Sequence, residues 1–421
     1  MSLPIGWTCS RLDQVAKTAT GGTPLRSNPE YFTGSIPWVK SGELEDNIIT
    51  DTQEHLTEEA IQCSSAKVFP RGTLLVALYG ATVGKTAILN THAAINQAIC
   101  AIFVDETVLD CGYVRYFLMH IRPDLLGKRY GGAQPNISQT VVRSTNIVYP
   151  PLGEQRQIAR VLSAVQRAIE RQERLIALTA ELKKALMQKL FTEGTRGEPL
   201  KQTEIRPVPE TWEIVRLDQI ATIERGKFAH RPRNAPEFYG GSIPFVQTGD
   251  VSQCDGRIRR YTQTLNERGV AISRMFPCGT VLITIAANIR YTGILEFDSA
   301  CTDSLVAITP TRGDSAEFLN HYLQTQQPIM DRMAPQGTQK NINIQFLRPW
   351  PVLRPSKEEQ SVIADVLNTV DEKRRRHQQM RDALQLLFRT LLHQLMTAQI
   401  RVHDLDLSAL DEPAVKAAGA T

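Results

Sequence analysis

Two long stretches of the chain place apolar residues at every third or fourth position. They run over residues 154 to about 192 and 357 to about 398, and neither contains proline or glycine. Long side chains that favour helices fill most of the other positions. Ser356, followed three residues later by Glu359, matches a capping box, in which each side chain bonds backbone at a helix start. The pattern therefore predicts two long helices.

The apolar positions of both stretches follow a heptad. The predicted seam consists of Ile158, Val161, Val165, Ala168, Gln172, Leu175, Thr179, Leu182 and Leu186 in the first stretch, and of Ile363, Val366, Val370, His377, Met380, Leu384, Leu387 and Leu391 in the second. A sustained heptad predicts a coiled coil, and helices that leave two successive globular parts can pair only antiparallel. Because Gln172, Lys373 and His377 interrupt the seam, two unrelated amphipathic helices, each lying on its own domain, remain the alternative.

The rest of the chain alternates short apolar runs with glycine and proline. The runs "TLLVAL", "ICAIFV", "TVLITIA" and "SLVAIT" predict buried strands, whereas "GYVRYFLMHIR" and "EFLNHYLQTQ" predict short helices. The fold class that follows is mixed α/β (α+β), strand-rich and irregular outside the two long helices.

The chain also repeats itself. "RLDQVA" at Arg11 returns as "RLDQIA" at Arg216, "SIPWVKSGEL" returns as "SIPFVQTGDV", and "EQRQIARVL" at Glu154 returns as "EQSVIADVL" at Glu359. Segments that return in the same order roughly 200 residues later indicate two copies of one unit, related by a pseudo-two-fold axis. The predicted parts are a globular domain at 1–150, a helix at 151–195, a second domain at 196–355, a second helix at 356–400 and a tail at 401–421.

Composition places the chain among folded proteins without a membrane segment. Of its 421 residues 42% are hydrophobic and 22% are charged, and no run of 18 apolar residues occurs. The N-terminus lacks a basic segment followed by an apolar run, and the seven scattered cysteines form no C-x-x-C pair. These features predict a cytoplasmic location with reduced thiols and no zinc site. The net charge of +4 alone does not predict nucleic-acid binding.

The segment "LYGATVGKTAIL" from Leu78 to Leu89 suggests a phosphate-binding loop, with Gly80, Gly84, Lys85 and Thr86 as its elements. However, only three residues separate Gly80 from Gly84, where that loop needs four. The second copy reads "IAANIRYTGIL" and has no Lys-Thr pair. We therefore expect Gly84 and its counterpart Gly293 to form turns between strands. A P-loop NTPase remains as an alternative function.

The combined motifs resemble the specificity subunits of type I restriction–modification enzymes. The resemblance rests on the W…RLDQ start, "SIPWVKSGEL", "FPRGTLLVALYGATVGK", "GAQPNI" and "PPLGEQRQIARVL", all followed by a long helix and all occurring twice. It implies two target-recognition domains on an antiparallel helix pair, each of which reads one half of a bipartite, asymmetric double-stranded DNA site. It also implies that the helices set the gap between the half-sites.

The resemblance further implies two docked methyltransferase subunits and two restriction subunits. S-adenosylmethionine, ATP and Mg²⁺ would act in those partners, so that this chain is expected to be non-catalytic, without cofactor or metal. The sequence agrees in lacking the "[DN]-P-P-[FY]" motif of adenine methyltransferases. A coiled-coil scaffold that binds only protein is a further alternative.

Candidate DNA-binding residues follow from comparing the two copies. Polar residues that match suit phosphates, which are alike everywhere, whereas residues that differ suit base readout. The matching candidates are Gln134 with Gln339 and Asn136 with Asn341, for which loop-closing hydrogen bonds are the alternative role. The differing candidates are Arg26 against Lys227, His230, Arg231 and Arg233; Lys40 against Gln247; and Lys85 against Asn288 and Arg290.

Overall fold

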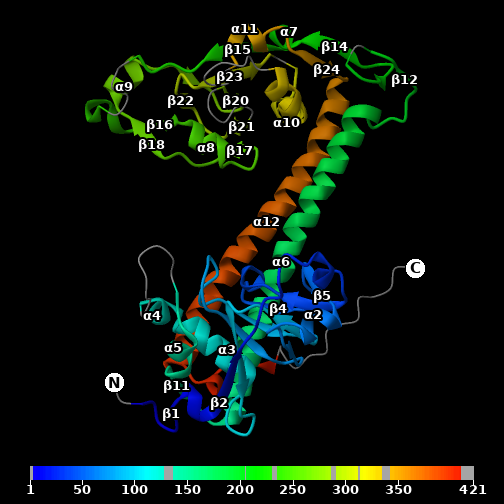
Figure 1. Ribbon diagram of the computed structural model, residues 1–421. Coiled ribbons are helices and arrows are strands. Elements are labelled where there is room, and N and C mark those ends of the chain that lie inside the picture. The colour runs from blue at the N-terminus through cyan, green and yellow to red at the C-terminus, as the bar shows by residue number, and fades with distance from the viewer. Residues whose placement is uncertain are drawn as a thin grey trace. The chain divides into compact units, whose positions relative to one another are not determined.

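The computed structural model describes residues 3–127, 136–203, 205–229, 235–285, 291–311, 313–333 and 342–408 (Figure 1). The chain divides into two compact units. Unit 1 combines residues 1–171 with 381–421, and unit 2 comprises residues 172–380. Each unit therefore contains one globular part together with a portion of both long helices.

The two long helices are continuous. Helix α6 spans Leu152–Glu193 and α12 spans Lys357–Met396 (Figure 1). In unit 1, Leu162 near the start of α6 shares a core with Leu395 near the end of α12. In unit 2, Phe191 near the end of α6 shares a core with Ile363 near the start of α12. The pairing is thus antiparallel, which confirms the predicted arrangement, and the alternative of unrelated helices is wrong.

The predicted seam needs one correction. Its first positions, such as Ile158 and Ile363, are buried, but Leu182, Val366, Met380 and Leu387 are exposed. Of the residues one place later, Lys183 and Leu367 are buried, and Arg381 and Phe388 are half-buried. Sequence patterning favoured Leu182 over Lys183 because an apolar side chain is the usual choice at a buried position. In the structure Lys183 is buried because Asp371 pairs with it, Nζ to Oδ2 at 2.6 Å.

Two of the three polar interruptions of the seam, Gln172 and His377, contact each other. Nδ1 of His377 lies 2.8 Å from Oε1 of Gln172, and the two residues occupy matching positions of the repeat. A polar pair in a coiled-coil seam fixes the register of the helices at some cost in stability.

The described residues of unit 1 form three sheets. The five-stranded sheet has the order β2(Ala16–Thr20), β10(Ile99–Val104), β7(Leu74–Ala77), β8(Thr86–Leu89), β4(Asn47–Ile49); the four-stranded sheet has the order β5(Glu54–Leu56), β3(Ile36–Val39), β9(Ala93–Ile95), β6(Val68–Phe69); and β1(Thr8–Arg11) pairs with β11(Asn146–Tyr149). The short helices of this unit are α1(Leu12–Val15), α2(Glu58–Gln62), α3(Cys111–His120), α4(Arg122–Gly127) and α5(Gln139–Arg143), with 3₁₀ turns at Pro29–Phe32, Ser41–Glu43 and Val402–Asp404.

Unit 2 repeats this plan. Its five-stranded sheet has the order β15(Ala221–Arg225), β23(Leu305–Pro310), β20(Val281–Thr284), β21(Thr292–Leu295), β17(Arg257–Ile258); its four-stranded sheet has the order β18(Gln263–Leu265), β16(Tyr239–Val246), β22(Ser299–Cys301), β19(Met275–Phe276); β14(Glu213–Arg216) pairs with β24(Pro351–Arg354), and β12(Leu200–Lys201) with β13(Val208–Pro209). The helices are α7(Leu217–Ile220), α8(Thr248–Ser252), α9(Glu267–Ala271), α10(Ala316–Met333) and α11(Ile344–Leu347), with a 3₁₀ turn at Pro236–Phe238. The same strand order in both units confirms the internal repeat.

The predicted strands and helices are present. The runs "TLLVAL" and "ICAIFV" supply the buried strands β7 and β10, and "TVLITIA" and "SLVAIT" supply β20 and β23. The predicted short helices are α3 and α10, of which α10 is longer than predicted and contains Pro328.

The glycine-rich segment is a turn between strands rather than a phosphate-binding loop. Gly80 and Gly84 have positive φ angles of 94° and 76°, and Thr86 begins strand β8. A P-loop requires a helix at that point, so this alternative loses its structural basis.

The expectation for Gly293 was wrong, because it lies inside strand β21. A Cβ atom there would approach the Sγ of Cys254 to 2.6 Å, so close packing explains this glycine. Among the residues that the structure describes, no helix is long and apolar enough to cross a bilayer.

Candidate nucleic-acid interface

Six of the predicted DNA-binding residues can be located. They are Arg26, Lys40, Lys85, Asn136, Lys227 and Gln247. The other candidates, Gln134, His230, Arg231, Arg233, Asn288, Arg290, Gln339 and Asn341, lie outside the described residues.

Arg26 and Lys40 share one carboxylate in unit 1. Glu54, at the start of β5, accepts from Nη1 of Arg26 at 2.6 Å and from Nζ of Lys40 at 2.7 Å. The bonds from Arg26 and Lys40 hold the pKa of Glu54 below its usual range. The guanidinium of Arg26 also lies 4.3 Å from the ring centroid of Phe32 and 5.0 Å from that of Trp38. Two cations facing one anion leave the cluster with one net positive charge.

At the matching place in unit 2, the described residues form an uncharged pair, Gln247 and Gln263. Gln263 stands opposite Phe245 in the strand pairing, as Glu54 stands opposite Trp38 in unit 1. Nε2 of Gln247, at the position that matches Lys40, donates to Oε1 of Gln263. The amide pair borders a cavity of about 190 Å³ lined by aromatic and polar side chains, including Phe228, Tyr239 and Phe245. Amides of this kind suit adenine, whereas Arg and Lys suit guanine or phosphate.

The remaining located candidates of unit 1 meet at the turn between β7 and β8. Tyr79 forms an isolated bridge with Asn136, and the hydroxyl of Thr82 donates to the carbonyl of Ser41, the residue after Lys40. Lys85, at the end of this turn, pairs with Glu45 at 2.9 Å. The structure therefore brings the surroundings of Lys40, Lys85 and Asn136 together. In unit 2, Lys227 is exposed.

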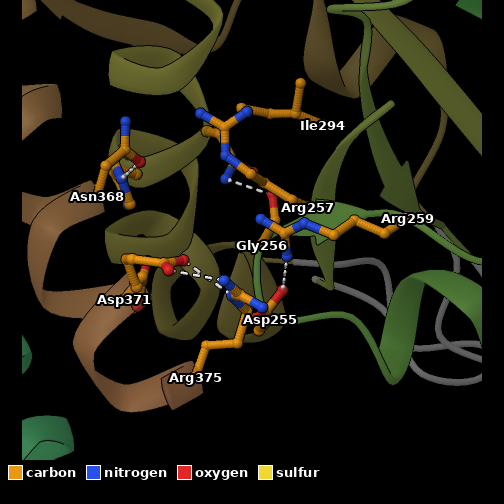
Figure 2. Close-up of a pocket in the computed structure, with 11 residues that line it drawn as sticks. Asp255, Gly256, Arg257, Arg259, Ile294, Asn368, Asp371 and Arg375 are labelled. Atoms are coloured by element: carbon orange, nitrogen blue, oxygen red, sulfur yellow. Dashed lines mark hydrogen bonds and ion pairs between the residues drawn. The ribbon is translucent and has the colours of Figure 1, made fainter. Parts of the chain in front are cut away.

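A charged cavity of about 220 Å³ lies in unit 2 between α10, the start of β17 and α12 (Figure 2). The charges that line it are paired among neighbours. Arg259 bonds Asp255 at 3.0 Å, and Arg375 bonds Glu372 at 2.6 and 2.8 Å. Arg257 pairs with two further carboxylates, Glu296 and Glu317. Each of these pairs lies within the globular part or within α12, whereas His321 of α10 contacts Asn368 of α12, Nε2 to Oδ1 at 3.0 Å.

Sequence reasoning missed the role of the repeated Glu-Gln pair. Gln155 is fully buried; its Oε1 accepts from the amide of Asp110 at 2.8 Å, and its Nε2 donates to the carbonyls of Val108 and Pro150. Gln360 makes the same kind of contacts with Ser315, Asp314 and Pro355. Both glutamines thus fix a globular part to the start of a long helix. The repetition of "EQ" was the available signal.

The glutamates of the same motif fasten the helix ends. Arg401, beyond α12, makes a bidentate pair with Glu154 at 2.8 and 2.7 Å. Thr195, beyond α6, bonds Glu359 through its amide at 2.8 Å and its hydroxyl at 3.0 Å. Nε1 of Trp212 also donates to Glu359. Each helix start is therefore bound to the segment that follows the other helix.

Among the described residues, no group of three or more histidine, cysteine or acidic side chains is placed to hold a metal ion.

Comparison with known proteins identifies the family. Residues 4–180 and 209–386 each match the model of the type I restriction modification DNA specificity domain. The chain is 23% identical over 430 residues to the type I restriction enzyme MjaVIII specificity subunit of Methanocaldococcus jannaschii, covering 96% of each chain. It is 27% identical over 256 residues to the MjaIX specificity subunit of the same organism, covering 58% of each.

Solved structures show the same fold. The S subunit of a type I restriction–modification system from M. genitalium superimposes with a TM-score of 0.63 at 17% identity, over 93% of this chain and 97% of that one. A chain from a structure on the assembly and conformational transition of the type I restriction–modification system gives a TM-score of 0.55 at 21% identity, over 95% of this chain and 100% of that one. With two matches to the domain model that together span most of its length, this chain belongs to the family of type I restriction–modification DNA specificity proteins and carries the domain in tandem.

Proposed function

We propose that this chain is the sequence-specificity subunit of a type I restriction–modification enzyme and reads a bipartite, asymmetric DNA site, one half with each globular part. The observation that carries the proposal is a shared framework with different surface chemistry. At matching places, unit 1 presents Arg26, Glu54 and Lys40, whereas unit 2 presents Gln247 and Gln263. Two copies that differed in nothing would read the same half-site twice.

The residues at these places support base readout in different ways. A guanidinium that leaves Glu54 can bond the O6 and N7 atoms of guanine, and a glutamine amide can bond the N6 and N7 atoms of adenine. Lys85 and Asn136 of unit 1 and Lys227 of unit 2 are proposed as further contacts to bases or phosphates. The eight candidates outside the described residues keep the same proposed role.

The chemistry is proposed to belong to partner subunits. Two methyltransferase subunits, using S-adenosylmethionine, would dock on the long helices, and two restriction subunits, using ATP and Mg²⁺, would complete the complex. Leu178 and Leu182 on α6 and Leu387 on α12 are each 45% to 49% exposed, which favours them as docking contacts. The lengths of α6 and α12 would set the number of base pairs between the half-sites.

An exchange of one domain tests this function. Residues 1–150 are replaced by the matching part of another such subunit, and the variant is produced with its methyltransferase. We expect methylation sequencing of the host genome to show one changed half-site and one retained half-site. A change in both halves would overturn the modular reading. Absence of DNA binding by the assembled wild-type complex would favour the protein-only scaffold.

A further inference from the structure

Four arginines lie along one side of α6 within unit 1, and all four are exposed. They are Arg156, Arg160, Arg167 and Arg171. Counted from the first, the others follow after 4, 11 and 15 residues, which is about one, three and four turns at about 3.6 residues per turn. The buried Ile158 and Leu162 lie on the opposite side of the helix. The four arginines therefore form one row, which we call the arginine stripe.

The spacing of the stripe is unfavourable for the helix itself. Arg156 and Arg160 are four residues apart, and so are Arg167 and Arg171. Like charges at this spacing are neighbours on the helix surface and destabilise it. For Arg156, Arg167 and Arg171, no ion pair occurs within the described part of the chain. The stripe thus costs stability, and the described residues do not offset this cost.

Two glutamates of α6 flank the stripe. Glu170 follows Arg167 by three residues, a spacing at which opposite charges can pair, but the structure shows no ion pair between these two residues. Glu173 is also exposed and lies further to the side. The glutamates therefore reduce the positive charge of this part of α6 but do not cancel it.

The second copy fills the same positions differently. The residues of α12 that match the stripe are Ser361, Asp365, Glu372 and Arg376. Glu372 and Arg376, at the positions of Arg167 and Arg171, form an ion pair at 3.0 Å. A favourable pair is thus compatible with this backbone, whereas α6 has a repelling pair in its place. The difference indicates that the stripe serves binding rather than folding.

The stripe passes beside a region of unit 1 already proposed to contact DNA. Gln166, the residue before Arg167, donates through Nε2 to the carbonyl of Asp46. The residue before Asp46 is Glu45, which pairs with Lys85 at 2.9 Å. The loop that holds the DNA-binding candidate Lys85 therefore lies against α6 at the level of Arg167.

We propose that the arginine stripe binds the phosphate backbone of duplex DNA in the gap between the half-sites, next to the half-site read by unit 1. This inference rests on the proposed function, which supplies the duplex. A row of guanidinium groups over about 22 Å, at about 1.5 Å per residue, is complementary to the repeated charges of a DNA strand. Because phosphates are alike in every sequence, the stripe adds affinity without changing the sequence that is read.

The test variant combines Arg156→Gln, Arg167→Gln and Arg171→Gln. The assembled methyltransferase complex is titrated with a duplex that contains the methylated site and with an unrelated duplex. We expect both duplexes to bind about tenfold more weakly than to wild type, because three arginines no longer release counterions from DNA. The slope of log affinity against log salt should fall by about 2 to 3 in magnitude. Sequencing of the host genome should show an unchanged methylated sequence.

Two further variants serve as controls. Ser361→Gln, Glu372→Gln and Arg376→Gln together change the matching positions of α12 without altering the net charge, and should keep the wild-type affinity and salt slope. Arg156→Lys, Arg167→Lys and Arg171→Lys together retain the charges of the stripe and should also keep the salt slope. Denaturant unfolding of the test variant checks its fold. We expect it to be at least as stable as wild type, because the like-charge pairs are removed.

Neutral methylphosphonate linkages in the duplex locate the contact. Three such linkages in the gap, beside the half-site of unit 1, should weaken binding by wild type but leave the affinity of the test variant unchanged. The same linkages beside the other half-site should affect wild type and the test variant equally.

Wild-type affinity and salt slope in the test variant would overturn the inference while leaving the proposed function in place. Loss of the methyltransferase from the complex of the test variant, measured by size-exclusion chromatography, would also overturn it and assign the stripe to a protein partner. Failure of the wild-type complex to bind any duplex would contradict the proposed function and this inference together.

Discussion

Helix α3 of unit 1 and its counterpart α10 of unit 2 contact the long helices through different side chains. In unit 1 the hydroxyl of Tyr116 bonds Ser163 at 3.0 Å and Gln166 at 3.1 Å, and its ring meets Phe388 edge-on with centroids 6.0 Å apart. In unit 2 the matching residue is His321, whose Nε2 donates to Oδ1 of Asn368 at 3.0 Å.

We call the place where this helix meets the long helices the joint. Its other positions carry uncharged residues in unit 1 and charged residues in unit 2. Lys183 of unit 2 matches Phe388 of unit 1, and Asp371 matches Gln166; Lys183 and Asp371 form a largely buried ion pair. Burial, and then the charge of Lys183, lower the pKa of His321 to about 4. One backbone arrangement thus accepts an aromatic joint in one copy and an ionic joint in the other. The shared fold depends on shape, whereas the response to pH and to mutation depends on the side chains.

Removal of Lys183 should have the largest effect. Lys183→Met leaves the buried carboxylate of Asp371 with Arg374, at 3.5 Å, as its remaining ion-pair partner among the described residues, and we expect a loss of about 3 kcal/mol in the free energy of unfolding. Phe388→Met, at the matching place of unit 1, should cost only about 1 kcal/mol because the side chain stays apolar and of similar volume. Denaturant unfolding of both variants measures the difference, and equal losses would remove the contrast between the joints.

Removal of the buried glutamine should lower the free energy of unfolding by nearly the same amount in both units. Gln155→Ala leaves a buried amide N–H and two carbonyls without these bonds, and Gln360→Ala leaves a buried amide N–H and one carbonyl, because Asp314 keeps its bond from Arg354. Each change is expected to cost about 2 to 3 kcal/mol. Thermal and denaturant unfolding of the two variants provide the measurement. A change that was severe in one copy and neutral in the other would show that the two joints do not share this anchor.

The ionic joint should weaken in acid. Because the pKa of His321 is about 4 in the folded chain and about 6.5 when unfolded, the unfolded chain binds the proton first. The contribution of neutral His321 to the free energy of unfolding is complete above pH 6.5 and is lost as the pH falls towards 4. About 2 kcal/mol of it is lost at pH 5.

The variant Lys183→Phe, His321→Tyr, Asn368→Ser, Asp371→Gln transfers the joint of unit 1 to unit 2. It should lose less stability than wild type between pH 7 and pH 5, measured by denaturant midpoints. Other charged groups face His321 and can also contribute to the pH dependence. They are Lys183, Asp255, Arg257, Asp371, Glu372 and Arg375. His321→Tyr alone separates the histidine from these neighbours. If its pH dependence equals that of wild type, His321 is not the titrating group.

The smallest effect concerns the surface cluster proposed to face DNA. Glu54→Gln frees Arg26 and Lys40, so we expect the assembled methyltransferase complex to bind duplex DNA about threefold more tightly, in keeping with a partly exposed ion pair. Gln263→Glu places the carboxylate in unit 2 and should weaken binding by a similar factor. Fluorescence anisotropy at several salt concentrations measures both, with the exposed Glu58→Gln as control. An unchanged affinity in both variants would place DNA elsewhere on these domains.

The sequence predicted the repeat, the long helices and most strands because these depend on local periodicity. The heptad pattern placed Leu182 in the seam, one residue before the buried Lys183, because nothing in the local sequence reveals that Lys183 pairs with Asp371. Glu54 and Gln263 escaped notice because only strand pairing aligns them, the connecting loops differing between the copies.

The contacts of Arg401 have a genetic consequence. This residue bonds both Glu154 and the carbonyl of Ile5, so the segment after α12 lies against the first residues, as the segment after α6 lies against the start of α12. A gene rearranged to begin near codon 201, with codons 1 onward fused behind α12, would encode the same contacts in a new order. Recombination within the codons of either "EQ" motif would likewise replace one globular domain by that of another such protein. The glutamate and glutamine that fix a globular domain to a long helix are already encoded in both copies.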